Sequence, residues 1–275
     1  MSVTLSTGRV VASGATPSRW LWLLHGIYGA GRNWNAVARR FVEASRDWGV
    51  LAIDLRGHGG SDRGAPPHTV LACAGDLLDL ADRGSAPPPN GVLGHSFGGK
   101  VAILFAEAAE LEYLRVIDST PSAREAGGSA WRMLDVLTNH PGPFPDRSAG
   151  IAAVASEGYA TPVAQWMGTN LVRDESGAWR WRLDPAQMED LLLDFFARDA
   201  WPALELAARA GTDVEIVKAS ESSVVSDDDV ARARELGSAG LPVRVVEVDG
   251  GHWLNADAPE RVAGLLAEGL SAAGG

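Results

Sequence analysis

The sequence has few cysteines and few basic residues, and these absences exclude several classes of protein. It contains one cysteine, Cys73, so an internal disulfide is excluded, and the apolar neighbours in LACAGDLLDLA predict a buried, structural thiol. Basic residues form no run, and 24 Lys+Arg against 35 Asp+Glu give a net charge of -11. A negative chain without a basic patch repels phosphates, so we expect no nucleic-acid partner.

Long hydrophobic runs are missing as well. No apolar stretch approaches the length that crosses a bilayer, and residues 1–11 lack the basic start and apolar core of a signal peptide. We therefore expect a cytoplasmic protein with no membrane span. The sequence has neither a metal-ligand cluster nor a nucleotide-binding loop, so no metal and no cofactor are expected.

What the chain does contain is enough apolar sequence for one large α/β domain. With 46% hydrophobic and 21% charged residues among 275, it has the composition of an ordinary globular protein. Short apolar runs that end in turn residues alternate with stretches of helical period. The six runs cover residues 19–26, 49–57, 90–96, 113–119, 213–220 and 242–251. This alternation predicts a doubly wound, mostly parallel sheet with helices between its buried strands.

The alternation stops between Thr120 and about Asp199. Helical pieces lie there among Pro and Gly, and five of the ten tryptophans occur there or just beyond, namely Trp131, Trp166, Trp179, Trp181 and Trp201. A structureless loop of about 80 residues is uncommon in a compact domain. We therefore predict a helical cap, residues 120–199, inserted over the sheet edge after the strand that ends near Asp118. The core then comprises residues 1–119 and 200–275.

A glycine-rich turn carries the clearest chemical signal. In GVLGHSFGGKVAILFA, residues Gly94 to Gly98 form a G-x-S-x-G motif between a predicted strand and a predicted helix. The sharp turn strains the backbone of Ser96 and exposes its hydroxyl at the C-terminal edge of the sheet. The amide of Phe97, at the helix start, faces an oxygen that gains charge beside Ser96. A phosphate loop or a plain turn is the alternative.

Together the motifs of this chain resemble those of the α/β-hydrolases, and among these the small bacterial serine carboxylesterases. The matching segments stand in the family's order and read LLHGIYGAGRNW, AIDLRGHGGSD, GHSFGGK and GGHWLNADAPE. The resemblance implies the fold and the nucleophile, Ser96. It also implies that the amide of Ile27 joins that of Phe97 in an oxyanion hole, while Tyr28 either lines the acyl pocket or only packs.

Six histidines compete for the role of general base, and one of them has the right position. His252 follows the last predicted strand, so it lies on the same edge of the sheet as Ser96 and completes the order nucleophile, acid, histidine. We predict that it is the base. His25 is expected to hold loop backbone, and His95 to flank the nucleophile and point away from it. Trp253 either packs or walls the pocket.

The carboxylate that should orient His252 is missing from its usual place. In most of the family an Asp follows the strand represented here by residues 213–220, where this sequence has Glu221 and no Asp. Three aspartates, residues 227–229, come several positions later. We expect them to be solvated in the first turn of a helix that Ser226 caps, where they complement the helix dipole.

Asp118 is the first choice for this acid, and Glu221 is the second. Asp118 ends the strand that follows the nucleophile's helix. Because neighbouring strands are only about 5 Å apart, its carboxylate can approach His252 from the other side. Some α/β-hydrolases carry the acid at this strand. An Asp that only caps the turn before Pro121 is the alternative.

The predicted activity is that of a serine hydrolase acting on small carboxylic esters, with thioesters as an option. The tryptophans of the insertion, Trp166 among them, favour a pocket for aromatic or short to medium acyl groups, although packing of a small cap explains them equally well. Arg173, Arg180 and Arg182 either bind a substrate carboxylate or are surface charges. The alternatives are a cofactor-free carbon–carbon hydrolase or lyase, whose acid usually follows the later strand, and a non-catalytic binding protein.

Overall fold

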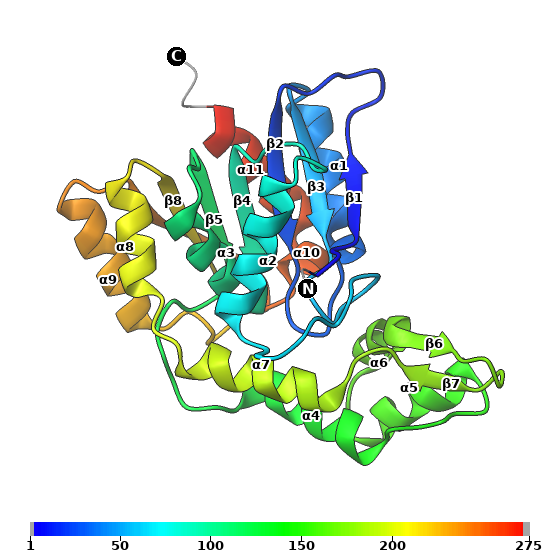
Figure 1. Ribbon diagram of the computed structural model, residues 1–275. Helices are drawn as coiled ribbons and strands as arrows, with labels where there is room; N and C mark the ends of the chain where they lie inside the picture. Colours follow the sequence, from blue (N-terminus) through cyan, green and yellow to red (C-terminus); the bar gives the residue numbers. More distant parts are fainter. Residues whose placement is uncertain (1–2, 272–275) are drawn as a thin grey trace.

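The computed structural model describes residues 3–271 and contains a seven-stranded central sheet (Figure 1). Its strands are β1 (Thr7–Val10), β2 (Arg19–Leu24), β3 (Trp48–Ile53), β4 (Gly91–His95), β5 (Tyr113–Ile117), β8 (Asp213–Ala219) and β9 (Val243–Val248). They lie in the order β1-β3-β2-β4-β5-β8-β9, and only β1 runs antiparallel to its neighbour. All six predicted strands are present, which confirms the predicted α/β fold. The sequence did not predict β1, because this edge strand is largely exposed and has no apolar run.

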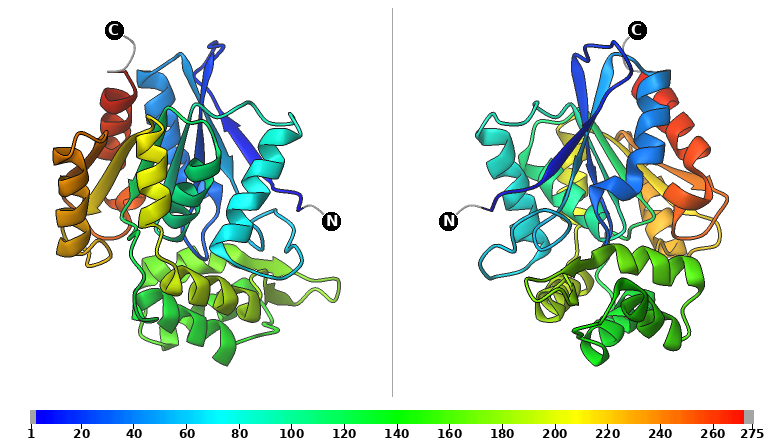
Figure 2. Two further views of the ribbon diagram at one scale, coloured as in Figure 1. Left: turned by 60° about the vertical axis from the view of Figure 1, so that its left-hand side comes forward. Right: turned by 90° about the vertical axis from the view of Figure 1, so that its right-hand side faces the viewer.

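Helices cover both faces of this sheet (Figure 2). They are α1 (Asn35–Ala44), α2 (Val70–Asp82), α3 (Phe97–Ala108), α8 (Trp201–Arg209), α9 (Asp227–Ser238), α10 (Leu254–Asp257) and α11 (Pro259–Ser271). The helices α2, α3, α8 and α9 pack on one face, and α1 and α11 pack on the other. Because both faces are covered, β4 and β5 are buried along their whole length, as continuous apolar strands of a parallel sheet should be.

Residues 120–199, which we call the inserted segment, lie across the carboxyl ends of the strands (Figures 1 and 2). The segment contains α4 (Gly128–Asn139), α5 (Arg147–Ser156), α6 (Thr161–Met167), α7 (Pro185–Ala197) and a hairpin of β6 (Leu171–Arg173) and β7 (Trp179–Trp181). Its helices were predicted but the hairpin was not. Strands of three residues are too short to show the alternating pattern that identifies a strand.

A buried lysine ties both ends of the inserted segment to the core. The Lys100 ammonium on α3 donates to the carbonyl of Ser122 at 2.9 Å, where the chain enters the segment. It also donates to the carbonyls of Phe195 at 2.7 Å and Arg198 at 2.8 Å, where the chain leaves through the end of α7. The residue is fully buried, and this burial lowers the pKa of the Lys100 side chain to about 7.

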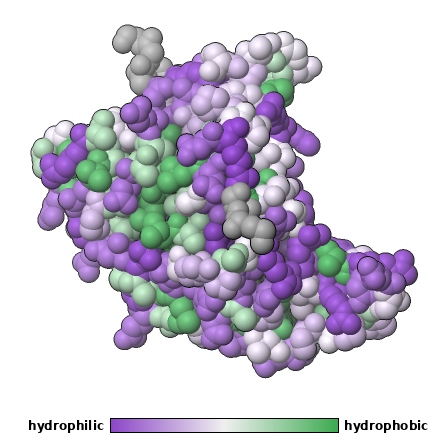
Figure 3. Space-filling view, in the orientation of Figure 1, coloured by the Kyte–Doolittle hydropathy of each residue, from purple (hydrophilic) through white to green (hydrophobic). Residues whose placement is uncertain are grey.

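The face of the molecule seen in Figure 3 is mostly hydrophilic. On the face seen in Figure 3, hydrophobic groups gather between α2 and α8, and Leu71 and Leu206 are exposed side chains of these two helices. In the described part of the chain, no helix combines the length and the hydropathy needed to pass through a bilayer. Cys73 lies buried on α2, as predicted, and burial raises the pKa of its thiol.

Candidate active site

The turn from β4 into α3 is held sharp by close backbone contacts. A Cβ atom on Gly98 would lie 2.4 Å from the carbonyl oxygen of His25, and one on Gly94 would lie 2.1 Å from the carbonyl oxygen of Gly98. Only glycine fits these two positions. Between them Ser96 adopts a φ of +52°, a conformation that non-glycine residues rarely adopt and that turns its hydroxyl away from the helix.

Three side chains from separate parts of the chain form one hydrogen-bonded row. The Ser96 hydroxyl donates to Nε2 of His252 at 3.0 Å, and Nδ1 of His252 donates to Oδ2 of Asp118 at 2.6 Å. His252 lies in the loop after β9, and Asp118 follows β5 directly. The carboxylate fixes the proton on Nδ1, so the lone pair on Nε2 faces the serine.

The Asp118 carboxylate is completely buried and is held by the neighbouring strand. Its Oδ1 accepts from the Ala219 amide at 3.1 Å, and its own amide donates to the Val217 carbonyl at 2.7 Å. Asp118 also adopts a positive φ of +41°. A buried carboxylate needs such partners, and here an amide of β8 and the imidazole of His252 supply them.

The second candidate acid, Glu221, lies apart from this row. Its side chain is exposed and makes no hydrogen bond to His252, while its amide donates to the Gly250 carbonyl at 3.0 Å. Asp227 and Asp228, in the first turn of α9, are exposed as predicted.

The prediction that the late aspartates are solvated is wrong for Asp229, which is 2% exposed. Its carboxylate accepts from the hydroxyl of Thr120 at 2.9 Å and from that of Ser122 at 2.5 Å. It also accepts from the amide of Ser226 at 3.0 Å, and the Ser226 hydroxyl in turn caps α9 as predicted. The sequence indicated only the local helix start, because the two hydroxyl partners are more than 100 residues away. Asp229 therefore fastens the loop that follows Asp118.

His95 also departs from the prediction, since its ring does not point away from the site. Its Nε2 lies 2.8 Å from the carbonyl oxygen of His252, and the two rings lie 4.8 Å apart. Burial lowers the pKa of His95 to about 3, so the imidazole is neutral at physiological pH. A carbonyl only accepts hydrogen bonds, so Nε2 carries the proton and His95 supports the backbone of His252.

Two residues that line the space beside the serine have unpaired backbone amides. Ile27 follows β2 and Phe97 is the first residue of α3, and both line the same hollow as Ser96. Within residues 3–271, neither amide donates to a protein acceptor. These are the two donors predicted for an oxyanion hole, and their N–H groups are available to a ligand.

The loop that carries Ile27 is fixed by neutral histidines and by one residue of the inserted segment. Nδ1 of His25 donates to the Gly26 carbonyl at 2.7 Å, and Nε2 of His58 accepts from the Tyr28 amide at 3.2 Å. Burial lowers the pKa of His25, and it lowers that of His58 to about 3. The Asn170 amide group donates to the Tyr28 carbonyl at 2.8 Å. Nothing in the sequence pointed to Asn170, because its contact bridges 142 residues.

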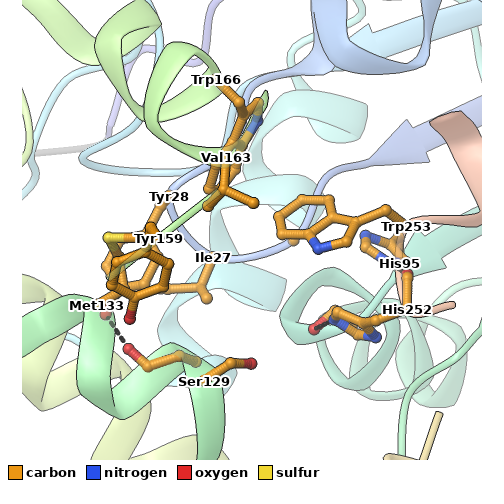
Figure 4. A pocket seen from close by; sticks show the side chains of 13 residues that line it. Ile27, Tyr28, His95, Ser129, Met133, Tyr159, Val163, Trp166, His252 and Trp253 are labelled. Carbon is orange, nitrogen blue, oxygen red and sulfur yellow. Dashed lines mark hydrogen bonds between the residues drawn. The ribbon is translucent and has the colours of Figure 1, made fainter. Parts of the chain in front are cut away.

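An aromatic hollow of about 250 Å³ opens from Ser96 toward the inserted segment (Figure 4). We call it the apolar arm. The predicted pocket residues Tyr28, Trp166 and Trp253 all line it, and the rings of Trp166 and Trp253 lie 4.5 Å apart. The lining is Gly26, Ile27, Tyr28, His95, Ser96, Ser129, Ala130, Met133, Tyr159, Val163, Trp166, His252 and Trp253. The other four tryptophans named for the insertion do not line it.

A second hollow of about 410 Å³ shares Ile27, Ser96, Ser129, Ala130 and His252 with the apolar arm. We call it the polar arm. It is lined by Ile27, Ser96, Phe97, residues 124–130, Leu192, Phe195, Phe196, Ser223, Val224 and His252. Sequence reasoning missed Arg124 here. Arg173 and Arg180 instead bond within the β6–β7 hairpin, and Arg182, just after it, lines neither arm.

No group of three or more His, Cys, Asp and Glu side chains in the described residues is arranged to hold a metal ion. The site itself offers the hydroxyl of Ser96, the imidazole of His252, the carboxylate of Asp118 and the amides of Ile27 and Phe97. A hydroxyl activated by a neighbouring base, beside two amide donors, is an arrangement suited to nucleophilic attack on a carbonyl group.

Comparisons with known proteins identify the family and the fold. A sequence model described as the alpha/beta hydrolase family matches residues 23–265. An sn-1-specific diacylglycerol lipase, ABHD11, of Danio rerio is 28% identical over 264 residues, covering 90% of this chain and 77% of the relative. Lipase LipV of Mycobacterium tuberculosis is 28% identical over 270 residues, covering 97% of both chains. The solved structure of a marine microorganism esterase is similar in fold, with a TM-score of 0.79, 22% identity and coverage of 98% of this chain and 99% of that one.

Proposed function

Because this chain belongs to the alpha/beta hydrolase family, we propose that it is a serine hydrolase that cleaves carboxylic esters, thioesters included. The observation that carries the proposal is the row from Ser96 through His252 to Asp118. Its Ser96 end shares a hollow with two amides that have no acceptor within residues 3–271. The lipase names of two relatives support an ester substrate.

In the first half of the proposed reaction, Nε2 of His252 takes the proton of the Ser96 hydroxyl as the oxygen attacks the ester carbonyl. The carbonyl oxygen becomes an oxyanion and accepts from the amides of Ile27 and Phe97. Removing one such donor costs about 3 to 4 kcal/mol of transition-state stabilisation in a well-studied case. His252 then gives its proton to the departing alkoxide, which leaves as an alcohol, and the acyl group stays on Ser96.

In the second half, water replaces the alcohol. His252 removes a proton from a water molecule that attacks the acyl carbon, and the same amides hold the second oxyanion. Collapse of this intermediate returns the proton to Ser96 and releases the carboxylic acid. Asp118 keeps its negative charge throughout and stabilises the imidazolium that forms twice in each cycle.

The proposed substrate has an apolar acyl group of short to medium length. The apolar arm, at about 250 Å³, lies just below the roughly 300–1,000 Å³ typical of ligand pockets, and its walls are mainly aromatic and aliphatic. Such walls favour alkyl or aromatic acyl groups through burial of apolar surface.

We also propose that residues 120–199 act as a cap on a core of residues 1–119 and 200–275. Six residues that line the apolar arm come from this segment, and Trp166 meets Trp253 of the core across it. Replacing Trp166 with Ala should shift the preferred acyl chain toward longer esters, measured as kcat/KM over a series of p-nitrophenyl esters. An unchanged chain-length profile would contradict this role.

The carbon–carbon hydrolase or lyase is the less favoured activity. In that branch the acid usually follows the strand that corresponds here to β8, whereas His252 pairs with Asp118 after β5. The third possibility is a binding protein that catalyses no reaction. It is less favoured because two amides without an acceptor in residues 3–271, beside a serine that is hydrogen-bonded to a histidine, are what stabilisation of an oxyanion requires.

A fluorophosphonate probe tests the proposal directly, because it reacts only with an activated serine. We expect covalent labelling of Ser96, located by peptide mass spectrometry, and release of p-nitrophenol from p-nitrophenyl butyrate. Ser96→Ala should abolish both, while its unfolding curve in urea stays cooperative. Failure of the probe to label the native protein would refute the enzyme hypothesis.

A further inference from the structure

The two arms that meet at Ser96 differ in charge. Arg124 and Glu125 are the only Arg, Lys, Asp or Glu side chains among the residues lining either arm, and both belong to the polar arm. Arg124 therefore brings a positive charge to the cleft of a protein whose net charge is -11. An ionic group of a substrate has no partner in the apolar arm.

The guanidinium of Arg124 is held in place but is mostly unused. Its backbone amide donates to the Phe196 carbonyl at 2.8 Å, and the guanidinium carbon lies 5.3 Å from the centre of the Phe196 ring. Its only side-chain hydrogen bond in residues 3–271 goes from Nη1 to the Val224 carbonyl at 3.3 Å. The carboxylates of Asp229 and Asp118 act on it electrostatically but form no ion pair with it, and both are bound by other partners. A guanidinium has several further N–H donors in a planar fork, a geometry that matches a carboxylate.

Glu125 does not neutralise this charge. Its carboxylate makes no hydrogen bond and no ion pair within the described residues, and it has no aromatic ring to hold it as Phe196 holds Arg124. Of the two charges, the arginine is therefore the one whose position is fixed at the wall of the arm. A fixed charge loses less conformational freedom on binding, so it contributes more to recognition.

We propose that the polar arm takes the alcohol part of an ester that carries a carboxylate, and that Arg124 binds this carboxylate. The inference rests on the proposed ester hydrolysis and adds a substrate class to it. The apolar arm then receives the acyl chain, Ser96 attacks between the two, and the alcohol leaves on the side of Arg124.

Three butyrate esters test the inference. They are p-nitrophenyl butyrate, its analogue with a carboxylate on the ring, and the butyrate of a trimethylammonio-phenol, which are neutral, anionic and cationic in the alcohol part. The readout is the kcat/KM of each charged ester divided by that of the neutral one. Comparing this ratio between variants cancels the intrinsic reactivity of each ester.

Arg124→Gln should lower the anionic-to-neutral ratio by about tenfold, as loss of a partly exposed charge-assisted contact does. Arg124→Lys should lower it less, because the charge remains while the planar fork is lost. Arg124→Glu should raise the cationic-to-neutral ratio. The control is Arg39→Gln on α1, at an exposed arginine that lines neither arm. This variant changes the net charge equally and should leave the ratios unchanged.

If Arg124→Gln leaves the anionic-to-neutral ratio unchanged, the inference is overturned. The proposed function would still stand in that case, provided that the wild-type protein hydrolyses the neutral ester. A ratio that Arg39→Gln lowers as much as Arg124→Gln would also overturn it, since net charge would then explain the preference. Absence of any turnover by the wild-type protein would remove both the proposed function and this inference.

Discussion

Two buried aspartates from different regions, Asp118 after β5 and Asp229 in α9, lie close to the same loop but bind different partners. Asp118 accepts from the imidazole of His252, whereas Asp229 accepts from the hydroxyls of Thr120 and Ser122 and from the start of its own helix. Both are nearly inaccessible to water. Their comparison separates a carboxylate that faces the histidine from one that holds the first carboxylate's loop.

The difference follows from where each residue leaves the sheet. Asp118 is the first residue after its strand, so its position is set by the pairing of β5 with β8. Asp229 comes ten residues after β8 ends at Ala219, and by then the chain has entered a helix. A carboxylate at the end of a strand lies at the edge of the sheet, where ligands bind. A carboxylate in the first turn of a helix instead accepts hydrogen bonds from the free backbone amides at the start of that helix.

The largest expected effect comes from Asp118→Asn. Without the carboxylate, the imidazole is no longer held in the tautomer that accepts from Ser96, so kcat should fall by about 10⁴-fold, as in a serine protease with the same change. The measurement is hydrolysis of p-nitrophenyl butyrate, with Asp228→Asn as an exposed control. A variant that retained near-normal kcat would exclude Asp118 as the acid.

A smaller effect is expected from Asp229→Asn. The amide replaces one of two acceptor oxygens, so one of the hydroxyls of Thr120 and Ser122 loses its partner, and unfolding free energy should fall by about 1 to 3 kcal/mol. We expect kcat to fall by about tenfold with KM little changed, because the Asp118 loop shifts by a fraction of an ångström. A loss of kcat as large as that of Asp118→Asn would contradict the assignment of Asp229 to holding the loop and of Asp118 alone to orienting His252.

Lys100 binds the same loop, and its effect on stability can be measured from the pH dependence of the unfolding free energy. Burial lowers the pKa of Lys100 to about 7 in the folded protein, whereas an ordinary lysine has a pKa of 10.5. As the pH rises, the folded protein therefore releases the Lys100 proton at a lower pH than the unfolded chain does. The unfolded chain therefore binds more protons between these values, and this residue makes the unfolding free energy rise with pH. Urea unfolding at about pH 6.5 and about pH 9.5 should show that rise reduced in Lys100→Met. An identical rise in the variant would contradict the lowered pKa.

The smallest effect is expected from Glu221→Gln. This side chain is exposed and has no contact with His252, so kcat and stability should stay within about twofold and about 0.5 kcal/mol of the wild type. The measurement is the kcat of Glu221→Gln and of Asp118→Asn on p-nitrophenyl butyrate, under the same conditions. A large loss of kcat with intact folding would transfer the acid to Glu221.

Sequence patterns predicted the parts of the molecule that depend on neighbouring residues. The apolar runs predicted β4 and β5, and these two strands determine where Ser96 and Asp118 stand. The exposed strand β1 and the hairpin β6–β7 gave no such pattern.

Side chains that act through distant partners could not be predicted in the same way. Asp229 looks like any acid in the first turn of a helix until Thr120 is brought beside it. The same holds for Asn170 against the oxyanion loop and for Arg124 at the wall of the polar arm. Their partners lie far away in sequence, and only the folded chain brings the groups together.

Ser96, Tyr28 and Asp118 are the three non-glycine residues with positive φ in the part of the chain that the structure describes, and all three border the candidate site. Each such conformation costs on the order of 1 to 3 kcal/mol, which the surrounding sheet and loops must offset. Glycine at these positions would relieve that cost and remove the functional side chain. A directed-evolution experiment that rewards heat resistance alone would therefore enrich inactive proteins, so any search for more robust variants of this chain has to select for turnover in every round.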